Sequence, residues 1–101
     1  MGKEYFVTER LRAFYVYERS QDGAEERVIR CRPKEGYHLF RVIAGYSANS
    51  AVSAYYFLAR NTMEVRQQVQ NILGKITIIG IYMIDDPEER KRILSDPLRM
   101  P

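Results

Sequence analysis

The residues best suited to chemistry are basic side chains interleaved with tyrosines. Arginine and lysine recur through residues 27–41, where the one acidic residue is Glu35. Guanidinium groups and aromatic rings on a sheet face can bind single-stranded nucleic acid by phosphate contact and stacking. The same residue types are enriched at the energetic centres of protein–protein interfaces. We therefore expect a binding surface made of Tyr15, Tyr17, Arg27, Arg30, Arg32, Lys34, Tyr37 and Arg41. The simplest alternative is a solvated edge strand whose charges prevent aggregation.

The sequence contains one histidine, His38, and one cysteine, Cys31. One residue of each type cannot build a zinc site within a single chain. Cys31 lies between two arginines, but side chains adjacent in a strand point to opposite faces, so these charges need not approach the sulfur. We expect Cys31 to be a buried or half-buried hydrophobic residue rather than a nucleophile, and His38 to be structural or exposed.

Acidic residues cluster at 85–89, where a carboxylate or metal site could form. The start of a helix accounts for all four of them, because acidic side chains cap and stabilise the positive helix end. The glycines form no phosphate-binding loop, and no nucleophile elbow is present. We therefore expect no catalytic residue, no cofactor and no metal. An enzyme whose site is shared between subunits is the third and weakest hypothesis.

Composition favours an ordinary globular protein. The 101 residues are 46% hydrophobic and 29% charged, which predicts one domain over residues 1–101, with 97–101 as a loose C-terminal tail. The net charge is +3, and the excess lies in residues 1–60. A single cysteine, the absence of a signal peptide and the lack of a long apolar run predict a soluble, cytoplasmic protein without a membrane segment.

Four strands are expected in the first sixty residues. Tyr5–Thr8 is either the beginning of the first strand or a short separate one. Asp22-Gly23 favours a hairpin turn, and Pro33 ends the second strand, which we expect to be exposed or at an edge. The predicted strands cover Arg10–Arg19, Glu26–Arg32, Tyr37–Gly45 and Tyr55–Arg60.

Residues 55–85 form a predicted strand–helix–strand unit that should hold the core. Residues 51–60 also fit the start of a long helix, but Asn61 and Glu64 form a capping pair that favours a helix beginning there. This helix, 61–73, should bury one stripe and end at Gly74. The stripe consists of Val65, Val69, Ile72 and Leu73.

The strand at 75–84 is apolar on both faces, which predicts cover on both faces or a central place in the sheet. Asp86 and Pro87 then predict the start of a second helix, and Asp96-Pro97 predicts its end. The expected fold class is therefore α+β: a small single domain with a mixed, mostly antiparallel sheet of about five strands and two helices, in the order β-β-β-β-α-β-α.

Part of the chain is similar to two families of binding proteins. The segments that carry the similarity are Phe40-Arg41-Val42, Tyr56-Phe57, residues 65–72 and Gly74-Lys75-Ile76. This pattern resembles the small capping linkers of the phycobilisome, and the same unit resembles small archaeal-type ribosomal proteins. Residues 1–38 and the last helix lie outside the similarity, and Leu73 stands where the linkers carry a second glycine. Both resemblances imply a non-catalytic binding protein and assign no site residue.

We therefore expect a small non-enzymatic protein that docks on a larger macromolecule as an adaptor, inhibitor or assembly factor. Another protein is the expected partner, and a second copy of the chain is one form that it could take. The alternative is an RNA- or single-stranded-DNA-binding domain that uses the same basic and aromatic face.

Overall fold

The computed structural model describes residues 4–7, 14–19, 28–47 and 51–95, without the side chains of 17–19, 28–30 and 95. This part of the chain contains six strands and two helices. The strands are β1 (Glu4–Phe6), β2 (Tyr15–Arg19), β3 (Val28–Pro33), β4 (His38–Gly45), β5 (Ser53–Ala59) and β6 (Thr77–Met83), and the helices are α1 (Thr62–Leu73) and α2 (Pro87–Ser95). The α+β fold with a mixed sheet is confirmed.

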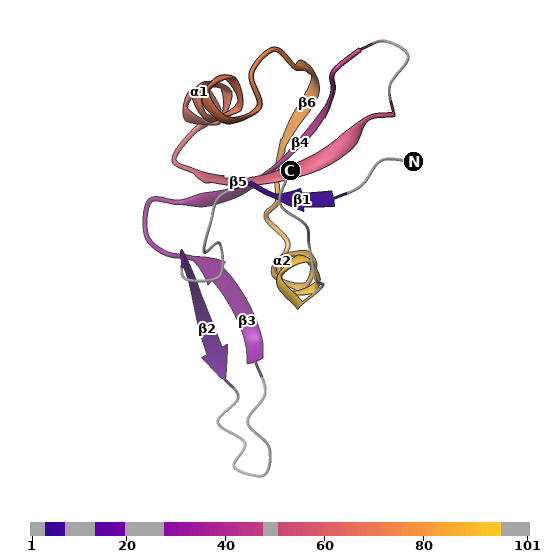
Figure 1. Ribbon diagram of the computed structural model, residues 1–101. Coiled ribbons are helices and arrows are strands. Elements are labelled where there is room, and N and C mark those ends of the chain that lie inside the picture. The colour runs from indigo at the N-terminus through magenta and orange to yellow at the C-terminus, as the bar shows by residue number, and fades with distance from the viewer. Residues whose placement is uncertain (1–3, 8–13, 20–27, 48–50, 96–101) are drawn as a thin grey trace.

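The strands divide between two sheets rather than forming the single sheet that we expected. One sheet has the order β1-β5-β4-β6, and the other is the hairpin β2-β3. β5 is parallel to β1, whereas β4 is antiparallel to both β5 and β6. Because β5 and β6 occupy both sides of β4, that strand has no free edge for β3. The hairpin therefore projects away from the larger sheet (Figure 1).

Helix α1 covers one face of the four-stranded sheet. Its buried residues Val65, Val69 and Leu73 pack on Phe40, Val42 and Ala44 of β4 and on Tyr55, Phe57 and Ala59 of β5. Gln68 donates a hydrogen bond to the Leu58 carbonyl oxygen at 3.2 Å, which ties α1 to β5. The burial of this apolar stripe accounts for most of the stability of a helix in water.

Helix α2 covers the other face together with the end of the hairpin nearer the sheet (Figure 1). The second core joins Tyr15 and Cys31 of the hairpin to Leu39, Tyr56 and Leu58 of the sheet and to Ile93 and Leu94 of α2. The buried Arg90 holds these parts together. Its Nε donates to the Cys31 carbonyl oxygen at 2.9 Å, and its Nη1 donates to the carbonyl oxygens of Ile84 at 3.0 Å and Asp85 at 2.7 Å.

Local sequence signals locate the helix starts correctly. Asn61 is extended and accepts a hydrogen bond from the Glu64 amide at 2.8 Å, so the predicted cap is confirmed and residues 53–59 are a strand. Asp86 accepts from the amides of Glu88 and Glu89, both at 3.3 Å, at the start of α2. The β2–β3 hairpin is also confirmed, and β1 is a separate strand. The predictions for the 22–23 turn, the end of α2 at 96–97 and the 97–101 tail lie outside the described residues.

Two burial predictions are wrong. Ile72 is 52% exposed, because the face of α1 that meets the sheet passes through Val65, Val69 and Leu73 and leaves Ile72 beside it. The strand β6 is an edge of the sheet instead of a central strand, and none of its residues is fully buried. Its apolar composition therefore does not reflect burial in the described fold.

Candidate functional site

The residues of the predicted basic and aromatic surface are divided between two sheets and a turn. In the hairpin, Tyr15 is opposite Pro33 and Val16 is opposite Arg32. This alternation puts Tyr15 and Arg32 on opposite faces: Tyr15 is 5% exposed and belongs to the core, whereas Arg32 is exposed. Lys34 is exposed in the turn after β3. Arg27 and the side chains of Tyr17 and Arg30 lie outside the described residues.

Arg41 belongs to a polar network inside the other sheet. Its Nη2 contacts Glu89 Oε1 at 2.7 Å, and its Nε donates to the Tyr56 hydroxyl at 3.2 Å. The Tyr56 hydroxyl donates in turn to Glu4 Oε1 at 2.9 Å. Burial lowers the pKa of Arg41, but its hydrogen bonds to Tyr56 and Glu89 raise the pKa by more. The network connects β1, β5, β4 and α2, and its central phenol is fully buried, so it serves the fold.

Tyr37 is also held by neighbours. Its ring meets Phe14 edge to face, with centroids 5.2 Å apart. The guanidinium carbon of Arg60 lies 5.8 Å from the Tyr37 ring centroid. A half-buried ring in contact with two side chains offers less area for stacking on a base than the sequence suggested.

The isolated reactive residues fit the structural roles that the sequence predicted. Cys31 is fully buried, and burial raises the pKa of its thiol, although the charges of Arg90 and Lys91 oppose that change. His38 is exposed at the start of β4. Asp86 caps α2 and Glu89 pairs with Arg41. Within the described residues, no group of three or more histidine, cysteine, aspartate or glutamate side chains could hold a metal ion.

The clearest open feature of the described fold is the outer edge of β6. The Ile84 amide donates to the Leu39 carbonyl oxygen of the β4 segment at 2.9 Å. Backbone groups alternate in direction along an antiparallel strand, so the amides and carbonyls of Ile81 and Met83 point away from β4. Among the described strands, none pairs with this side of β6.

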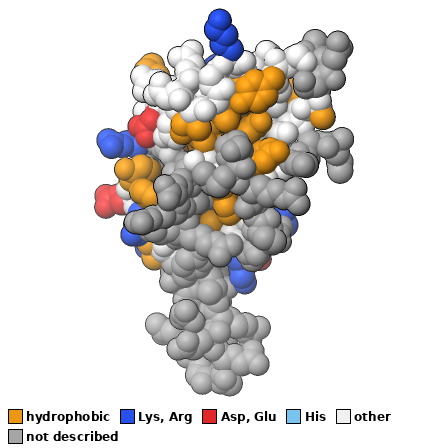
Figure 2. Space-filling model, in the orientation of Figure 1, with side chains coloured by type: hydrophobic (Ala, Val, Ile, Leu, Met, Phe, Trp, Pro, Cys, Tyr) orange, Lys and Arg blue, Asp and Glu red, His pale blue; other side chains and the backbone are white. Residues whose placement is uncertain are grey.

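The side chains of β6 are also unusual for an edge. Ile79, Tyr82 and Met83 are 61%, 55% and 47% exposed, and no residue of the strand Thr77–Met83 is charged or a proline. Natural edges are usually protected by charge, proline or a bulge. β6 has one of these devices: the register slips where Ile43 faces Gly80 and Ala44 faces Ile78, leaving Ile79 as the extra residue. Figure 2 shows hydrophobic side chains at the surface around α1 and the nearby strands.

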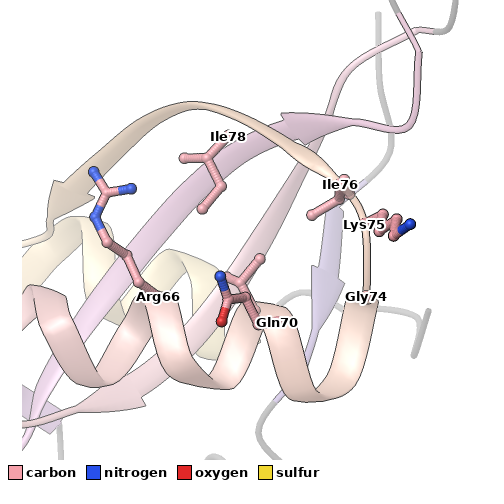
Figure 3. Close-up of a pocket in the computed structure, with 7 residues that line it drawn as sticks. Arg66, Gln70, Gly74, Lys75, Ile76 and Ile78 are labelled. Atoms are coloured by element: carbon pink, nitrogen blue, oxygen red, sulfur yellow. The ribbon is translucent and has the colours of Figure 1, made fainter.

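A groove of about 430 Å³ lies between α1 and the beginning of β6 (Figure 3). Val69, Ile76 and Ile78 supply its apolar lining. Arg66 and Gln70 rise from α1 toward the space under β6, while Lys75 extends from the turn away from the helix. Gly74 also lines the groove, and none of its lining residues in the described part of the chain is acidic. The groove is therefore suited to a ligand that has an apolar part next to a negatively charged part.

Sequence reasoning missed this region for a physical reason. Apolar residues on both faces of 75–84 indicated burial, and only the pairing partners reveal that β6 is an edge. One signal was present in the sequence: a glycine, Gly74, marks the end of α1, and the next strand begins after a very short turn. In the structure Gly74 has a φ of 71°. Such a connection places the last turns of α1 beside the beginning of β6, and therefore Arg66 and Gln70 beside Ile78.

Comparisons with known proteins leave the function open. No family model, no curated protein and no solved structure matches the chain. In the described part of the chain, neither helix has the length and apolar character needed to cross a membrane.

Proposed function

We propose that the chain is a non-enzymatic docking protein that binds an extended segment of another protein along the outer edge of β6. The observation that carries this proposal is an edge strand that is seven residues long, uncharged, and exposes three large apolar side chains. An extended segment added to such an edge gains main-chain hydrogen bonds, and pockets beside the strand select its side chains.

The reactive groups support a binding role more than a catalytic one. The Tyr56 hydroxyl is already bonded to Arg41 and Glu4, and Cys31 is buried with a raised thiol pKa. A catalytic group must come within hydrogen-bond reach of a substrate, and these two are enclosed. We also propose a cytoplasmic location, which the single cysteine supports.

Nucleic-acid binding through the basic hairpin has less support. Stacking on bases needs exposed rings, but Tyr15 is buried and Tyr37 contacts Phe14 and Arg60. The β6 edge lies in the other sheet and carries no cation between Thr77 and Met83. A protein segment therefore fits this edge better than a phosphate backbone does.

Selection of peptides tests the proposal directly. Random seven-residue peptides displayed on phage would be selected on the immobilised full chain, and the selected sequences would then be tested against two variants. Met83→Pro removes an amide that points outward and spares the hydrogen bonds to β4. Met83→Ala shortens the same side chain and keeps the amide. We expect Met83→Ala to retain most of the affinity and Met83→Pro to lose about tenfold or more.

A folding check keeps this result interpretable. Circular dichroism and amide spectra of Met83→Pro should match those of the parent chain away from β6, because proline is tolerated where a strand amide faces solvent. In the parent chain, bound peptide should shift the amide signals of Ile81 and Met83. Peptides that bind both variants equally and leave these signals unchanged would refute the β6 edge as the docking site.

A further inference from the structure

We infer that the segment bound at β6 carries a carboxylate next to an apolar side chain, and that the groove between α1 and β6 recognises this pair. The inference rests on the proposed docking at β6 and names the chemistry of the partner. Arg66 would bind the carboxylate, and Ile76 and Ile78 would receive the apolar side chain.

The groove is continuous with the outer edge of β6. Ile78 belongs both to β6 and to the lining of the groove, and Ile76 lies in the turn just before the strand. A segment paired with β6 would direct every second side chain to the face on which α1 lies. Those side chains would therefore enter the space between β6 and the exposed residues Arg66 and Gln70 (Figure 3).

The positive charge of the groove favours a partner that carries a negative charge. Among the described residues that line the groove, Arg66 and Lys75 are cationic and none is acidic. Within the described residues, neither of these cations forms an ion pair, whereas Arg41 pairs with Glu89 and Arg60 contacts Glu64. A guanidinium group binds a carboxylate through paired hydrogen bonds, and such charge-assisted bonds are stronger than neutral ones. The Gln70 amide next to Arg66 can donate a further bond to the same group.

A second copy of the chain is a weaker occupant than a different protein. The β6 strand has no charged residue between Thr77 and Met83, so it would bring no carboxylate to Arg66 from within the paired segment. A second copy would also bring its own extra residue at Ile79. A bulge bends its strand and increases the local twist, so two copies would bring two such bends to one ladder. A flexible acidic segment of another protein meets neither obstacle.

Three synthetic peptides test the inference by fluorescence anisotropy with the full chain. Each has seven residues, the length of β6, with valine at alternate positions and threonine between them. One inner valine is replaced by glutamate, glutamine or lysine, which places the variable side chain on the valine face. We expect the glutamate peptide to bind at least about fivefold more tightly than the glutamine peptide, and the lysine peptide to bind most weakly.

A charge reversal supplies the decisive comparison. Arg66→Glu should reverse the order, so that the lysine peptide binds best. Lys91→Glu makes the same change in net charge at an exposed position of α2, on the other face of the sheet, and it should keep the parent order. If Lys91→Glu alters the preference as much as Arg66→Glu does, general charge attraction explains the binding and the inference is overturned.

The remaining outcomes separate this inference from the proposed function. If the three peptides bind equally well, and bind only to chains without the Met83→Pro substitution, recognition by Arg66 is refuted. Docking at β6 is then still supported. Absence of binding by these peptides, together with failure of the phage selection, would refute both. A doubled mass in light scattering, with Ile81 and Met83 amides protected in the absence of peptide, would show that a second copy occupies the edge and would also refute both.

Discussion

Strands β5 and β6 are equally long and similarly apolar, yet the fold uses them in opposite ways. Both strands have seven residues. Gly80 is the one residue of β6 that has no side chain to bury. Five consecutive residues of β5 are buried, whereas β6 has no fully buried residue. The two strands differ in their pairing: among the described strands, β5 lies between β1 and β4, whereas β6 pairs with β4 alone. An apolar sequence therefore shows that a strand has side chains suited to burial. It does not show whether other parts of the same chain cover those side chains.

Truncation of matched residues should give the largest contrast between the two strands. Phe57→Ala in β5 removes a fully buried ring and should lower the free energy of unfolding by about 3–5 kcal/mol. Ile79→Ala in β6 removes a side chain that is 61% exposed and should change it by about 0.5 kcal/mol or less. Urea denaturation with unchanged m-values measures both effects. Equal losses would mean that β6 is covered in solution.

The next largest effect should come from Arg90, which connects α2 to the hairpin and to the segment that follows β6. Arg90→Met keeps much of the volume but leaves the carbonyl oxygens of Cys31, Ile84 and Asp85 without their donor. We expect a loss of about 2–3 kcal/mol in the free energy of unfolding. Arg66→Met, the same substitution at an exposed position, is the control and should cost far less. A similar cost at both positions would argue against Arg90 as the connection.

A smaller, pH-dependent effect should distinguish the buried phenol of β5. Burial raises the pKa of Tyr56, and the hydrogen bond from Arg41 opposes that change. As the pH rises, the Tyr56 hydroxyl therefore loses its proton in the unfolded chain before it does so in the folded chain. The folded state then loses stability as the pH rises above the ordinary tyrosine pKa of 10.0. The contribution is complete below that pH. Urea midpoints between about pH 9 and 11 should therefore fall.

Tyr56→Phe isolates this effect. The variant should lose about 1 kcal/mol at neutral pH through its missing hydrogen bonds, and its stability should fall less steeply in alkaline solution. Tyr82→Phe removes the corresponding hydroxyl from the exposed ring of β6 and is the matched control. Parallel pH curves for the parent chain and Tyr56→Phe would contradict the assignment to Tyr56.

Local signals in the sequence were sufficient for most of the secondary structure. Asn61 with Glu64 and Asp86 with Pro87 identified the helix starts, because a cap depends on residues a few positions apart. The same reasoning placed β5 before α1 rather than extending the helix. It also identified Cys31 as a buried hydrophobic residue, because the alternation of a strand is local.

Pairing between distant strands could not be derived in this way. The parallel contact of β1 with β5 joins residues about fifty positions apart, and no local signal specifies it. The same limit separated Arg41 from the hairpin arginines and placed β6 at an edge. Arg90 is a further case, because its partners include the Cys31 carbonyl of β3, which lies 59 positions earlier in the chain. The binding role of the basic residues in the hairpin stays a prediction.

Amide hydrogen exchange along β6 in dilute, peptide-free protein tests the open edge most directly. We expect fast exchange at Ile81 and Met83, whose amides point outward, and slow exchange at Ile84, whose amide donates to Leu39. Addition of a binding peptide should then slow Ile81 and Met83 selectively. Equal protection of all three amides in the free chain would show that the edge is already paired, and it would contradict an open β6 edge.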